Sequence, residues 1–358
     1  MAQEIIVIGG GGTGGHLYPG IAIAEELTRR RRGLEIVFAG AGLPLEREIL
    51  DRHGFRHLAV LSGGVVGKSF PARARGAWRA FRGVLQSMRA LIRMKPKAVI
   101  GVGGYASGPM VLAAVVLRVP TLIQEQNLVP GLTNRLLAPL ARRVAISFEE
   151  TRHHLGGRGE VTGNPIRAAF RDARRKTRGD TFNVLIFGGS QGARAVNTAV
   201  IEALPHLEAH RLGLRIVHGT GPADLDRVRA ACAAYGFEAR VLPYIAGIQE
   251  AYEKADLVIA RAGASSVAEI AACGKASILV PLARSAHDHQ RHNARRFADA
   301  GAAILMEEKD LGGEALARTI LALREDSGRL VAMERAAAAL ARPDAAARIA
   351  DMVEEMIA

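Results

Sequence analysis

The chain has 358 residues, of which 49% are hydrophobic and 23% are charged. That length and composition indicate a globular protein with room for two domains, each with its own core, and they exclude wholesale disorder. The two cysteines, Cys232 and Cys273, have no paired spacing, which excludes a disulfide framework or a cysteine zinc site and is typical of a reducing compartment. No basic segment precedes an apolar one at the N-terminus, so we expect a cytoplasmic protein.

The formal net charge of +13 is concentrated in the first half of the sequence. Residues 1–160 hold 22 Lys and Arg against 11 Asp and Glu, and from Arg52 to Gln124 twelve basic residues occur without an acidic one. Within that stretch the segment KSFPARARGAWRAFRGVLQSMRALIRMKPK mixes arginines with the apolar residues Phe70, Trp78, Phe81, Leu85, Met88, Leu91 and Ile92.

Three interpretations of this segment remain open. Arginines interleaved with large apolar residues are typical of a helix that lies on an anionic membrane surface. An amphipathic helix packed on a sheet, with its arginines in water, is the first alternative. A nucleic-acid surface is the second, and it is disfavoured because aromatic residues make up only 4% of the chain and no nucleic-acid motif occurs.

Apolar, β-branched runs alternate with helical patterns along the first half, which predicts βαβ units and a parallel sheet. The longest uncharged run, Ala98 to Leu117, is interrupted by glycines and a proline. We interpret it as a strand, a glycine turn and a buried helix rather than a membrane span. The strands expected in this half are Ile5–Ile8, Leu34–Phe38, His57–Leu61, Ala98–Val102, Thr121–Ile123 and Arg143–Ile146.

The first strand runs into the glycine-rich stretch IIVIGGGGTGGHLYPGIAIAEEL. Gly9-x-Gly11-x-x-Gly14 formally matches the dinucleotide fingerprint, but the second strand ends VFAGAGLP without the acid that would hold a ribose, so NAD is disfavoured. A glycine loop that opens a helix offers N–H donors and a positive dipole end to an anion. The same helix ends in Arg29–Arg32, where cations complement its dipole.

Two further motifs are interpreted as non-catalytic. GGVVGKS at Gly63–Ser69 lacks the phosphate-loop spacing, because Ser62 stands where a glycine is required, so we expect a flexible basic loop. The only D-x-D, Asp224-Leu225-Asp226, follows a Gly-Pro turn, and we expect it to begin a helix rather than to hold Mg²⁺.

The second half repeats the plan of the first, because NVLIFGGSQGARAVNTAV again joins a strand to a helix through glycines. The polar, basic stretch RDARRKTRGDTFN indicates a boundary between the halves. Two sets of six strands, each led by a glycine loop, predict two doubly wound α/β domains. The strands expected in this half are Asn183–Phe187, Leu214–His218, Ala239–Leu242, Leu257–Ala260, Ser277–Val280 and Ala303–Met306, and the closing segment ARPDAAARIADMVEEMIA is expected to be a helix.

A further anion site is predicted in ADLVIARAGASSVAEIAACGKASILVP. The strand Leu257–Ala260 is followed by Arg261, by Gly263–Ser266 and by a helix, so backbone N–H groups are again available to phosphate. Glu269, about one turn into that helix, has the chemistry to accept hydrogen bonds from two ribose hydroxyls. The alternative for Glu269 is an acid that complements the helix dipole.

The sequence contains, in this order, the motifs GGTGGH with PG, GGYAS, QEQN, TGNPIR, GGSQGA, RAGASSVAE and DHQRHNA. Together they closely resemble the MurG glycosyltransferases of glycosyltransferase family 28, over nearly the whole chain. The resemblance implies an α/β GT-B fold, with two Rossmann-like doubly wound domains facing a central cleft. It implies an acceptor- and membrane-binding domain at 1–165, a UDP-sugar-binding domain at 166–340, and a helix at 341–358 that packs back on the first domain.

The resemblance also implies an inverting transfer of N-acetylglucosamine from UDP-N-acetylglucosamine to the C4 hydroxyl of the N-acetylmuramoyl unit of lipid I, which forms lipid II in peptidoglycan synthesis. The implied partners are these two substrates and the anionic inner leaflet, with no nucleic acid, and the implied location is the cytoplasmic face of the bacterial inner membrane. No metal and no other cofactor is expected. A nucleotide-sugar epimerase, a glycolipid transferase and a non-catalytic nucleotide- or RNA-binding protein are the alternatives.

The site residues follow from the same motifs. The backbone of Ile245 is expected to read uracil and Glu269 the ribose, while Ser190, Arg167 and the loop from Ala264 hold the donor diphosphate. Gln290 and Asn127 are expected to contact the sugar. The lipid I diphosphate is expected near the loop Gly9–Gly15. The full set of implied substrate-binding residues is Thr13, Gly14, Gly15, Asn127, Arg167, Ser190, Ile245, Ala264, Ser265, Ser266, Val267, Ala268, Glu269 and Gln290.

Inversion requires a base to take the proton from the acceptor hydroxyl as it attacks. His16, at the mouth of the first glycine loop, is the candidate, and a histidine bonded to the loop backbone is the structural alternative. Asn127 and Tyr105 are candidates for positioning the acceptor.

Overall fold

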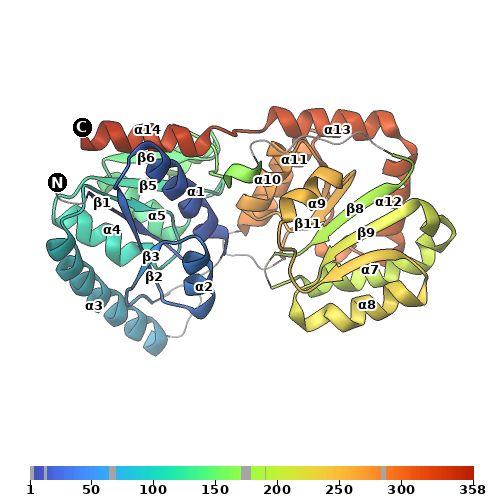
Figure 1. Ribbon diagram of the computed structural model, residues 1–358, viewed down its shortest axis with the longest axis horizontal. Helices are drawn as coiled ribbons and strands as arrows, with labels where there is room; N and C mark the ends of the chain where they lie inside the picture. The colour runs from blue at the N-terminus through green and yellow to red at the C-terminus, as the bar shows by residue number, and fades with distance from the viewer. Residues whose placement is uncertain (1–3, 12–13, 64–69, 171–178, 190, 284–287) are drawn as a thin grey trace. The chain divides into compact units, whose positions relative to one another are not determined.

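The structure, a computed structural model, describes residues 4–11, 14–63, 70–170, 179–189, 191–283 and 288–358. Its internal contacts divide the chain into two compact units. Unit 1 comprises Met1–Arg167 and Pro343–Ala358, and unit 2 comprises Ala168–Arg342. Each unit is built around its own parallel β-sheet, and the two are described separately (Figure 1).

Unit 1 contains a seven-stranded sheet in the order β3-β2-β1-β4-β5-β6-β7, with every neighbouring pair parallel. Its strands are β1 (Ile5–Gly9), β2 (Glu35–Gly40), β3 (Arg56–Ala59), β4 (Ala98–Gly101), β5 (Thr121–Glu125), β6 (Arg143–Ile146) and β7 (Glu160–Val161). Its helices are α1 (Gly14–Arg30), α2 (Pro44–Arg52), α3 (Phe70–Met94), α4 (Ser107–Val116), α5 (Leu132–Leu137), α6 (Thr151–His154) and α14 (Ala345–Ile357), with a 3₁₀ turn at Ala138–Leu140.

Alternating residues of β1 place two apolar layers on the two faces of this sheet, because successive side chains of a strand point in opposite directions. Ile6 and Ile8 lie in a core formed with α1, α2 and α14. Val7 lies in a second core formed with α3, α4 and α5. Both faces of the sheet are therefore covered by helices, as a parallel sheet requires.

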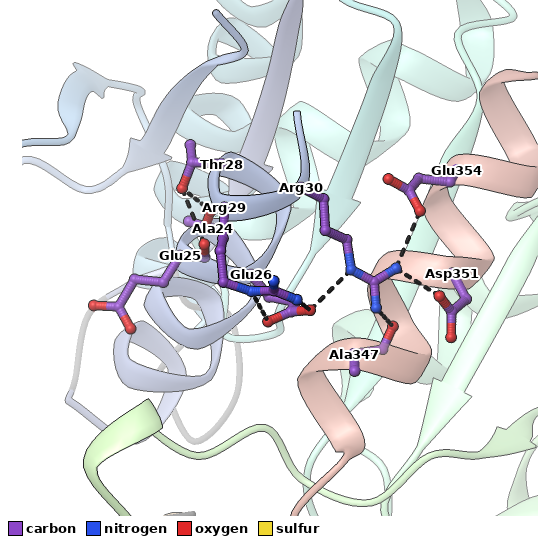
Figure 2. Close-up of polar contacts among 9 residues, drawn as sticks. All are labelled: Ala24, Glu25, Glu26, Thr28, Arg29, Arg30, Ala347, Asp351 and Glu354. Carbon is purple, nitrogen blue, oxygen red and sulfur yellow. Dashed lines mark hydrogen bonds and ion pairs between the residues drawn. The ribbon is translucent and has the colours of Figure 1, made fainter. Parts of the chain in front are cut away.

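Helix α14 returns from the end of the chain to complete unit 1, and it lies beside α1 (Figure 1). The guanidinium of Arg30 joins the two helices (Figure 2). It donates to Glu26 Oε1 on its own helix at 2.8 Å, and to Asp351 Oδ1 at 2.5 Å, Glu354 Oε2 at 3.0 Å and the Ala347 carbonyl at 3.1 Å on α14. From the sequence this basic tract was interpreted only as a complement to the helix dipole, because the acidic partners of Arg30 on α14 lie more than 300 residues away.

Unit 2 contains a six-stranded parallel sheet in the order β10-β9-β8-β11-β12-β13. Its strands are β8 (Phe182–Phe187), β9 (Leu214–Gly219), β10 (Glu238–Leu242), β11 (Leu257–Ala260), β12 (Ala276–Leu279) and β13 (Ala303–Leu305). Its helices are α7 (Arg194–Leu207), α8 (Leu225–Ala234), α9 (Ile248–Lys254), α10 (Ala264–Ala272), α11 (His289–Asp299), α12 (Gly313–Glu325) and α13 (Ser327–Ala339), with 3₁₀ turns at Ala168–Phe170, Glu208–Gly213, Pro222–Asp224 and Glu308–Asp310. Residues of α7, α8, α12 and α13 form the main core with the strands.

The predicted alternation of strands and helices is confirmed, with one correction. The first half was expected to hold six strands, but its sheet has seven, because the two-residue strand β7 pairs with the edge of β6. The run from Ala98 is strand, turn and buried helix as predicted, and ARPDAAARIADMVEEMIA contains α14. The GGVVGKS motif lies almost wholly outside the described residues. None of the helices in the described part of the chain has both the length and the apolar character that a membrane span needs.

Candidate active site

The glycine-rich stretch after β1 packs closely against other parts of unit 1. A Cβ on Gly10 would lie 2.3 Å from Val102 Cγ2, and one on Gly9 would lie 3.3 Å from Met110 Cβ. Part of the glycine requirement therefore comes from packing against Val102, which follows β4, and against α4, in addition to any approach by an anion. Of the expected site residues here, Thr13 lies outside the described residues, whereas Gly14 and Gly15 form the first turn of α1.

His16 lies in the first turn of α1, against the loop that follows β4. Its Nδ1 is 3.2 Å from the carbonyl oxygen of Val102, which also accepts a hydrogen bond from Gln126 Nε2 at 2.8 Å. A carbonyl accepts only, so Nδ1 carries the proton and Nε2 keeps its lone pair. Burial lowers the pKa of His16, while the hydrogen bonds to Val102 and Gln126 oppose that shift. The ring is thus held neutral, in the tautomer that has a basic Nε2.

Gly103 and Gly104 shape the surface on which the imidazole of His16 rests. Both have positive φ angles, of 90° and 74°. A Cβ on Gly103 would lie 3.1 Å from His16 Nδ1, and one on Gly104 would lie 3.3 Å from His16 Cδ2. Glycine is needed here for both reasons, because a side chain would be strained and would press on the ring. Tyr105 follows directly and is exposed.

Glu125, at the end of β5, is a buried carboxylate surrounded by four donors. It accepts from the backbone N–H groups of Asn127 at 2.9 Å and Gly131 at 3.1 Å, and from the side-chain amides of Asn134 at 2.9 Å and Asn127 at 3.3 Å. Burial raises the pKa of Glu125, and these hydrogen bonds oppose the rise. The carboxylate fixes the loop that carries Asn127, one of the expected sugar contacts.

Arg167 stacks on the aromatic ring of Tyr18 on α1, with its guanidinium carbon 4.8 Å from the ring centre. The contact is a cation–π interaction within unit 1. The predicted place of Arg167 beside the donor diphosphate stays a prediction.

Helix α2 places an acidic residue, Glu46, near the end of β2, where no acid was expected from the sequence. Glu46 is 4% exposed, and its Oε2 accepts from the backbone N–H groups of Gly42 at 2.8 Å and Leu43 at 3.2 Å. A Cβ on Gly11 would lie 2.3 Å from Glu46 Oε1, so the carboxylate also packs against the first glycine loop. Its hydrogen bonds to the backbone give Glu46 a local structural role in holding these turns.

In unit 2 the loop after β8 rests on the turn after β9. A Cβ on Gly192 would lie 1.9 Å from the carbonyl oxygen of Thr220, and one on Gly221 would lie 2.3 Å from the carbonyl oxygen of Gln191. Ile245, in the loop after β10, is buried, and it lies 3.2 Å from where a Cβ on Gly219 would be. The structure therefore brings Ile245 and the glycine loop to the same edge of the sheet, whereas Ser190 lies outside the described residues.

Helix α10 is separated from the end of β11 by three residues, and no side chain caps its N-terminus, since its N-cap residue is Gly263. The first turn, Ala264–Ser266, is partly exposed, and the N–H of Val267 donates to the Gly263 carbonyl at 3.0 Å. The Val267 side chain is in the core, so only its backbone is suitable for a ligand contact. Ala268 is partly exposed, and Glu269 is buried five residues after the helix begins. This terminus has the form of an anion site.

Two side chains, those of Arg261 and Asn293, hold the loops around that terminus. Arg261 is 8% exposed, donates to the carbonyls of Val280 and Pro281 at 3.2 and 3.1 Å, and pairs with Glu308 at 2.5 Å. The Asn293 side chain donates to the Ala262 carbonyl at 3.1 Å.

Gln290 accepts a hydrogen bond from the Leu282 N–H at 3.0 Å through Oε1, which leaves its NH₂ group on the other side of the amide. Its expected contact with the sugar stays a prediction.

The D-x-D motif lies at the start of α8 as predicted, but its first acid does not cap the helix. Asp224 accepts instead from Asn197 Nδ2 at 2.9 Å and from Arg227 Nε at 3.2 Å. Among the described residues no group of three or more His, Cys, Asp or Glu side chains is arranged to hold a metal ion.

Comparison with known proteins matches both units to family models. Residues 6–146 match the glycosyltransferase family 28 N-terminal domain, and residues 183–349 match the family 28 C-terminal domain. The chain belongs to glycosyltransferase family 28. The predicted GT-B fold class, with two Rossmann-like domains, is confirmed, since both sheets are parallel and doubly wound.

This family 28 chain is similar to full-length relatives. A protein of Syntrophus aciditrophicus is 45% identical over 356 residues, covering 98% of each chain, and is named UDP-N-acetylglucosamine--N-acetylmuramyl-(pentapeptide) pyrophosphoryl-undecaprenol N-acetylglucosamine transferase. The crystal structure of Acinetobacter baumannii MurG is 30% identical, with a TM-score of 0.79, and the match covers 98% of this chain and 99% of that one. A putative UDP-N-acetylglucosamine 2-epimerase of Listeria monocytogenes, at 16% identity and a TM-score of 0.69 over 98% and 95% of the two chains, shares the fold.

Several residues that shape the site of this family 28 chain were not predicted from the sequence. Glu125, Gln126 and Asn134 were not assigned roles, although Glu125 gave a usable signal, since a charged residue follows the apolar strand residues Leu122 and Ile123 with only Gln124 between them. Glu46 gave no such signal. Its position depends on how α2 folds back over β2, which sequence spacing alone does not reveal.

Proposed function

We propose that this chain transfers N-acetylglucosamine from UDP-N-acetylglucosamine to the C4 hydroxyl of the N-acetylmuramoyl unit of lipid I, with inversion, and so forms lipid II for peptidoglycan synthesis. The observation that carries the proposal is the 45% identity to a transferase of that name over 98% of both chains. In each unit one parallel strand, β1 or β8, is followed by a glycine-rich loop that leads into a helix, as in anion-binding sites of α/β proteins.

Unit 2 is proposed to bind the donor. The uncapped N-terminus of α10 supplies N–H groups and the positive end of its dipole to the diphosphate, and Ser190 adds to them. Arg167, which belongs to unit 1, is proposed as a further contact of the diphosphate. The backbone of Ile245 is proposed to contact the uracil, and Glu269 is proposed to contact the ribose. Gln290 is proposed to contact the N-acetylglucosamine that is transferred. The charge that develops on the departing UDP is then stabilised by these N–H groups without a metal ion.

Unit 1 is proposed to bind lipid I, with its diphosphate at the first glycine loop. His16 takes the proton from the C4 hydroxyl through Nε2 as that oxygen attacks the anomeric carbon and UDP leaves. Two features support this role. The hydrogen bond from Nδ1 to Val102 fixes the required tautomer, and burial keeps the ring neutral. Asn127 and Tyr105 position the acceptor.

Helix α3 is proposed to bind the anionic cytoplasmic face of the inner membrane. Trp78, Phe81 and Ile92 on this helix are 62%, 52% and 57% exposed, whereas Leu91 faces the core. The rings of Trp78 and Phe81 stack with centroids 5.7 Å apart. Exposed arginines interleave with them at positions 79, 82, 89 and 93. Apolar side chains flanked by cations are the pattern that inserts below lipid headgroups.

The transfer reaction is tested with labelled UDP-N-acetylglucosamine and a lipid I analogue. We expect release of UDP and label in the lipid product only when the acceptor is present. Conversion of the donor to N-acetylmannosamine without an acceptor would identify an epimerase, and UDP binding without any reaction would leave a binding protein; either result overturns the proposal.

Membrane binding is tested by co-sedimentation with vesicles of anionic or neutral lipid. We expect binding to the anionic vesicles, weakened by salt and by Trp78→Ala. Leu212→Ala is the matched control, because Leu212 is 91% exposed but lies in unit 2. Equal loss of binding in both variants would contradict the proposal that α3 binds the membrane. Equal binding to anionic and neutral vesicles would contradict it as well.

A further inference from the structure

A chain of buried polar side chains lies beneath the loops at the carboxyl edge of the unit 2 sheet. Asn197 on α7 and His218 at the end of β9 are both fully buried. His218 Nε2 is 2.9 Å from Asn197 Oδ1. Asn197 Nδ2 donates to the Thr220 carbonyl at 2.9 Å and to Asp224 Oδ2 at 2.9 Å. One side chain from α7 is therefore bonded to β9, to the turn after β9 and to the N-terminus of α8.

The partners fix the orientation of each group. Thr220 and Asp224 present only oxygens to Asn197, so the NH₂ end must face them and Oδ1 must face His218. The Nε2 of His218 consequently carries the proton, and the ring is neutral. Its Nδ1 is buried and has no hydrogen-bond partner among the described residues. Both N–H donors of the Asn197 amide and its oxygen have partners, so the amide has a single arrangement.

The turn that Asn197 holds is in direct contact with the glycine loop after β8. The Thr220 carbonyl, which Asn197 binds, is the same atom that a Cβ on Gly192 would meet at 1.9 Å. Gly221 lies on the carbonyl of Gln191, with a Cβ position only 2.3 Å away. On the other side of the turn, Gly219 contacts Ile245. The turn thus lies between the two segments proposed to contact the diphosphate and the uracil.

We infer that Asn197 and His218 are positioning residues that set the UDP-binding loops of unit 2 through the Thr220–Gly221 turn. The inference rests on the proposed function, because it assumes that these loops bind UDP. Neither side chain touches the ligand in this assignment. Their effect is to hold the backbone of two loops at one spacing, so that their N–H groups meet the donor without rearrangement.

Stability alone does not explain such a network. A buried pair of polar groups can be replaced by apolar groups of the same shape at little cost in free energy of unfolding. The hydrogen bond from Asn197 does more than fill space, because it fixes the direction in which the Thr220 carbonyl points. A purely structural role predicts equal effects from equal disruptions anywhere in the unit, whereas a positioning role predicts a specific loss of donor binding.

Asn197→Asp is the first test, with Asn183→Asp as its matched control. Both asparagines donate from Nδ2 to a backbone carbonyl and to an aspartate, Asn183 to Thr181 at 3.0 Å and Asp256 at 3.2 Å, at the opposite end of the sheet. In either variant a carboxylate oxygen replaces the donor and faces two oxygens. We expect the Kd for UDP, measured calorimetrically on the full chain, to rise roughly tenfold in Asn197→Asp and to stay within about twofold in Asn183→Asp.

Gly221→Ala is the second test, and it keeps the inference falsifiable if Asn197→Asp fails to fold. The added methyl group presses the turn against Gln191. Gly236→Ala is the control, because its φ of 66° is close to the 77° of Gly221, but its Cβ would meet nothing nearer than 3.6 Å. We expect weaker UDP binding in Gly221→Ala only, and a higher KM for UDP-N-acetylglucosamine with an unchanged KM for the acceptor.

The outcomes distinguish a failure of the proposed UDP site from a failure of the positioning role of Asn197 and His218. If the unmodified chain does not bind UDP, the proposed function of these loops is wrong. If it binds UDP, and Asn197→Asp and Gly221→Ala bind it as well as their controls do, the donor assignment stands and the positioning role is overturned.

Discussion

Replacing Arg30 with methionine removes the bond between the first and last helices of unit 1 while keeping most of the aliphatic stem. The guanidinium is shared by Glu26 on α1 and by Asp351, Glu354 and the Ala347 carbonyl on α14 (Figure 2). We expect the variant to fold, because the apolar contacts between the helices remain, but to be less stable.

The size of the loss follows from the exposure of each partner. The Glu26 side chain is 2% exposed, and a hydrogen bond to such a charged group contributes about 1.5–3 kcal/mol. Asp351 and Glu354 are 58% and 33% exposed, so water screens them and together they add roughly 0–1 kcal/mol. Arg29 still pairs with Glu26 at 2.7 Å, which keeps the total below the 3–5 kcal/mol expected for an uncompensated buried charge. The expected loss is about 2–3 kcal/mol.

Urea and thermal unfolding measure this loss. For a unit of this size, about 2–3 kcal/mol lowers Tm by about 4–12 °C. Arg143→Met is the matched control, because Arg143 also pairs with α14, at 2.8 Å from Glu355, but both side chains are largely exposed. We expect the control to lose less than about 0.5 kcal/mol. Equal Tm values for the two variants would refute the argument that the burial of Glu26 decides the energy.

Four further outcomes are expected. His16→Ala lowers turnover by roughly 10²–10⁴-fold and leaves the affinity for UDP unchanged. In the unmodified chain kcat/KM falls only below pH 6.5, because burial lowers the pKa of His16. A fall in kcat/KM that begins above pH 6.5 as the solution is acidified would contradict the assignment of His16 as the base. EDTA leaves the transfer rate unchanged if helix N-termini carry the diphosphate charge, whereas a loss restored by Mg²⁺ refutes this. Burial raises the pKa of Cys232 to about 11 and of Cys273 to about 12, so a thiol reagent modifies them only after unfolding, and rapid labelling of the folded chain speaks against their burial. Burial lowers the pKa of His218 to about 4, so between pH 6.5 and 4 the unfolded chain binds more protons than the folded chain. The free energy of unfolding therefore falls as the pH drops through that range. His218→Gln should reduce the dependence of the free energy of unfolding on pH, and an unchanged dependence would contradict this explanation.

The strands were predictable because their signal is local. The structure gives the strands Leu257–Ala260 and Arg143–Ile146 the bounds that were predicted for them. Each contains a buried apolar run, and polar residues lie at the ends of that run. Glu160–Val161 was missed because two residues show no alternation, and β7 exists only through its pairing with β6. The polarity of a short edge strand carries no comparable information.

The candidate site was only partly predictable for the same reason. Both glycine loops and the helix start after β11 were located, because glycines between a strand and a helix form a sequence-local pattern. The side chains that hold those loops are distant in sequence from what they hold. Asn197 lies 23 residues before Thr220, and its neighbour Asp224 was read only as part of a helix start. Such pairings depend on the packing of helices on a sheet.

The position of α14 in unit 1 affects how the chain folds during translation. The core that contains Ile6 and Ile8 also contains Ile349, Val353 and Met356. During synthesis, residues 168–342 have to emerge between the two parts of that core, which takes roughly 10 to 35 s at typical ribosomal rates. Until then one face of the first sheet has no cover from α14. Unit 1 expressed alone would need residues 343–358 supplied by a short fusion, and unit 2 can be removed as a block without dividing either core.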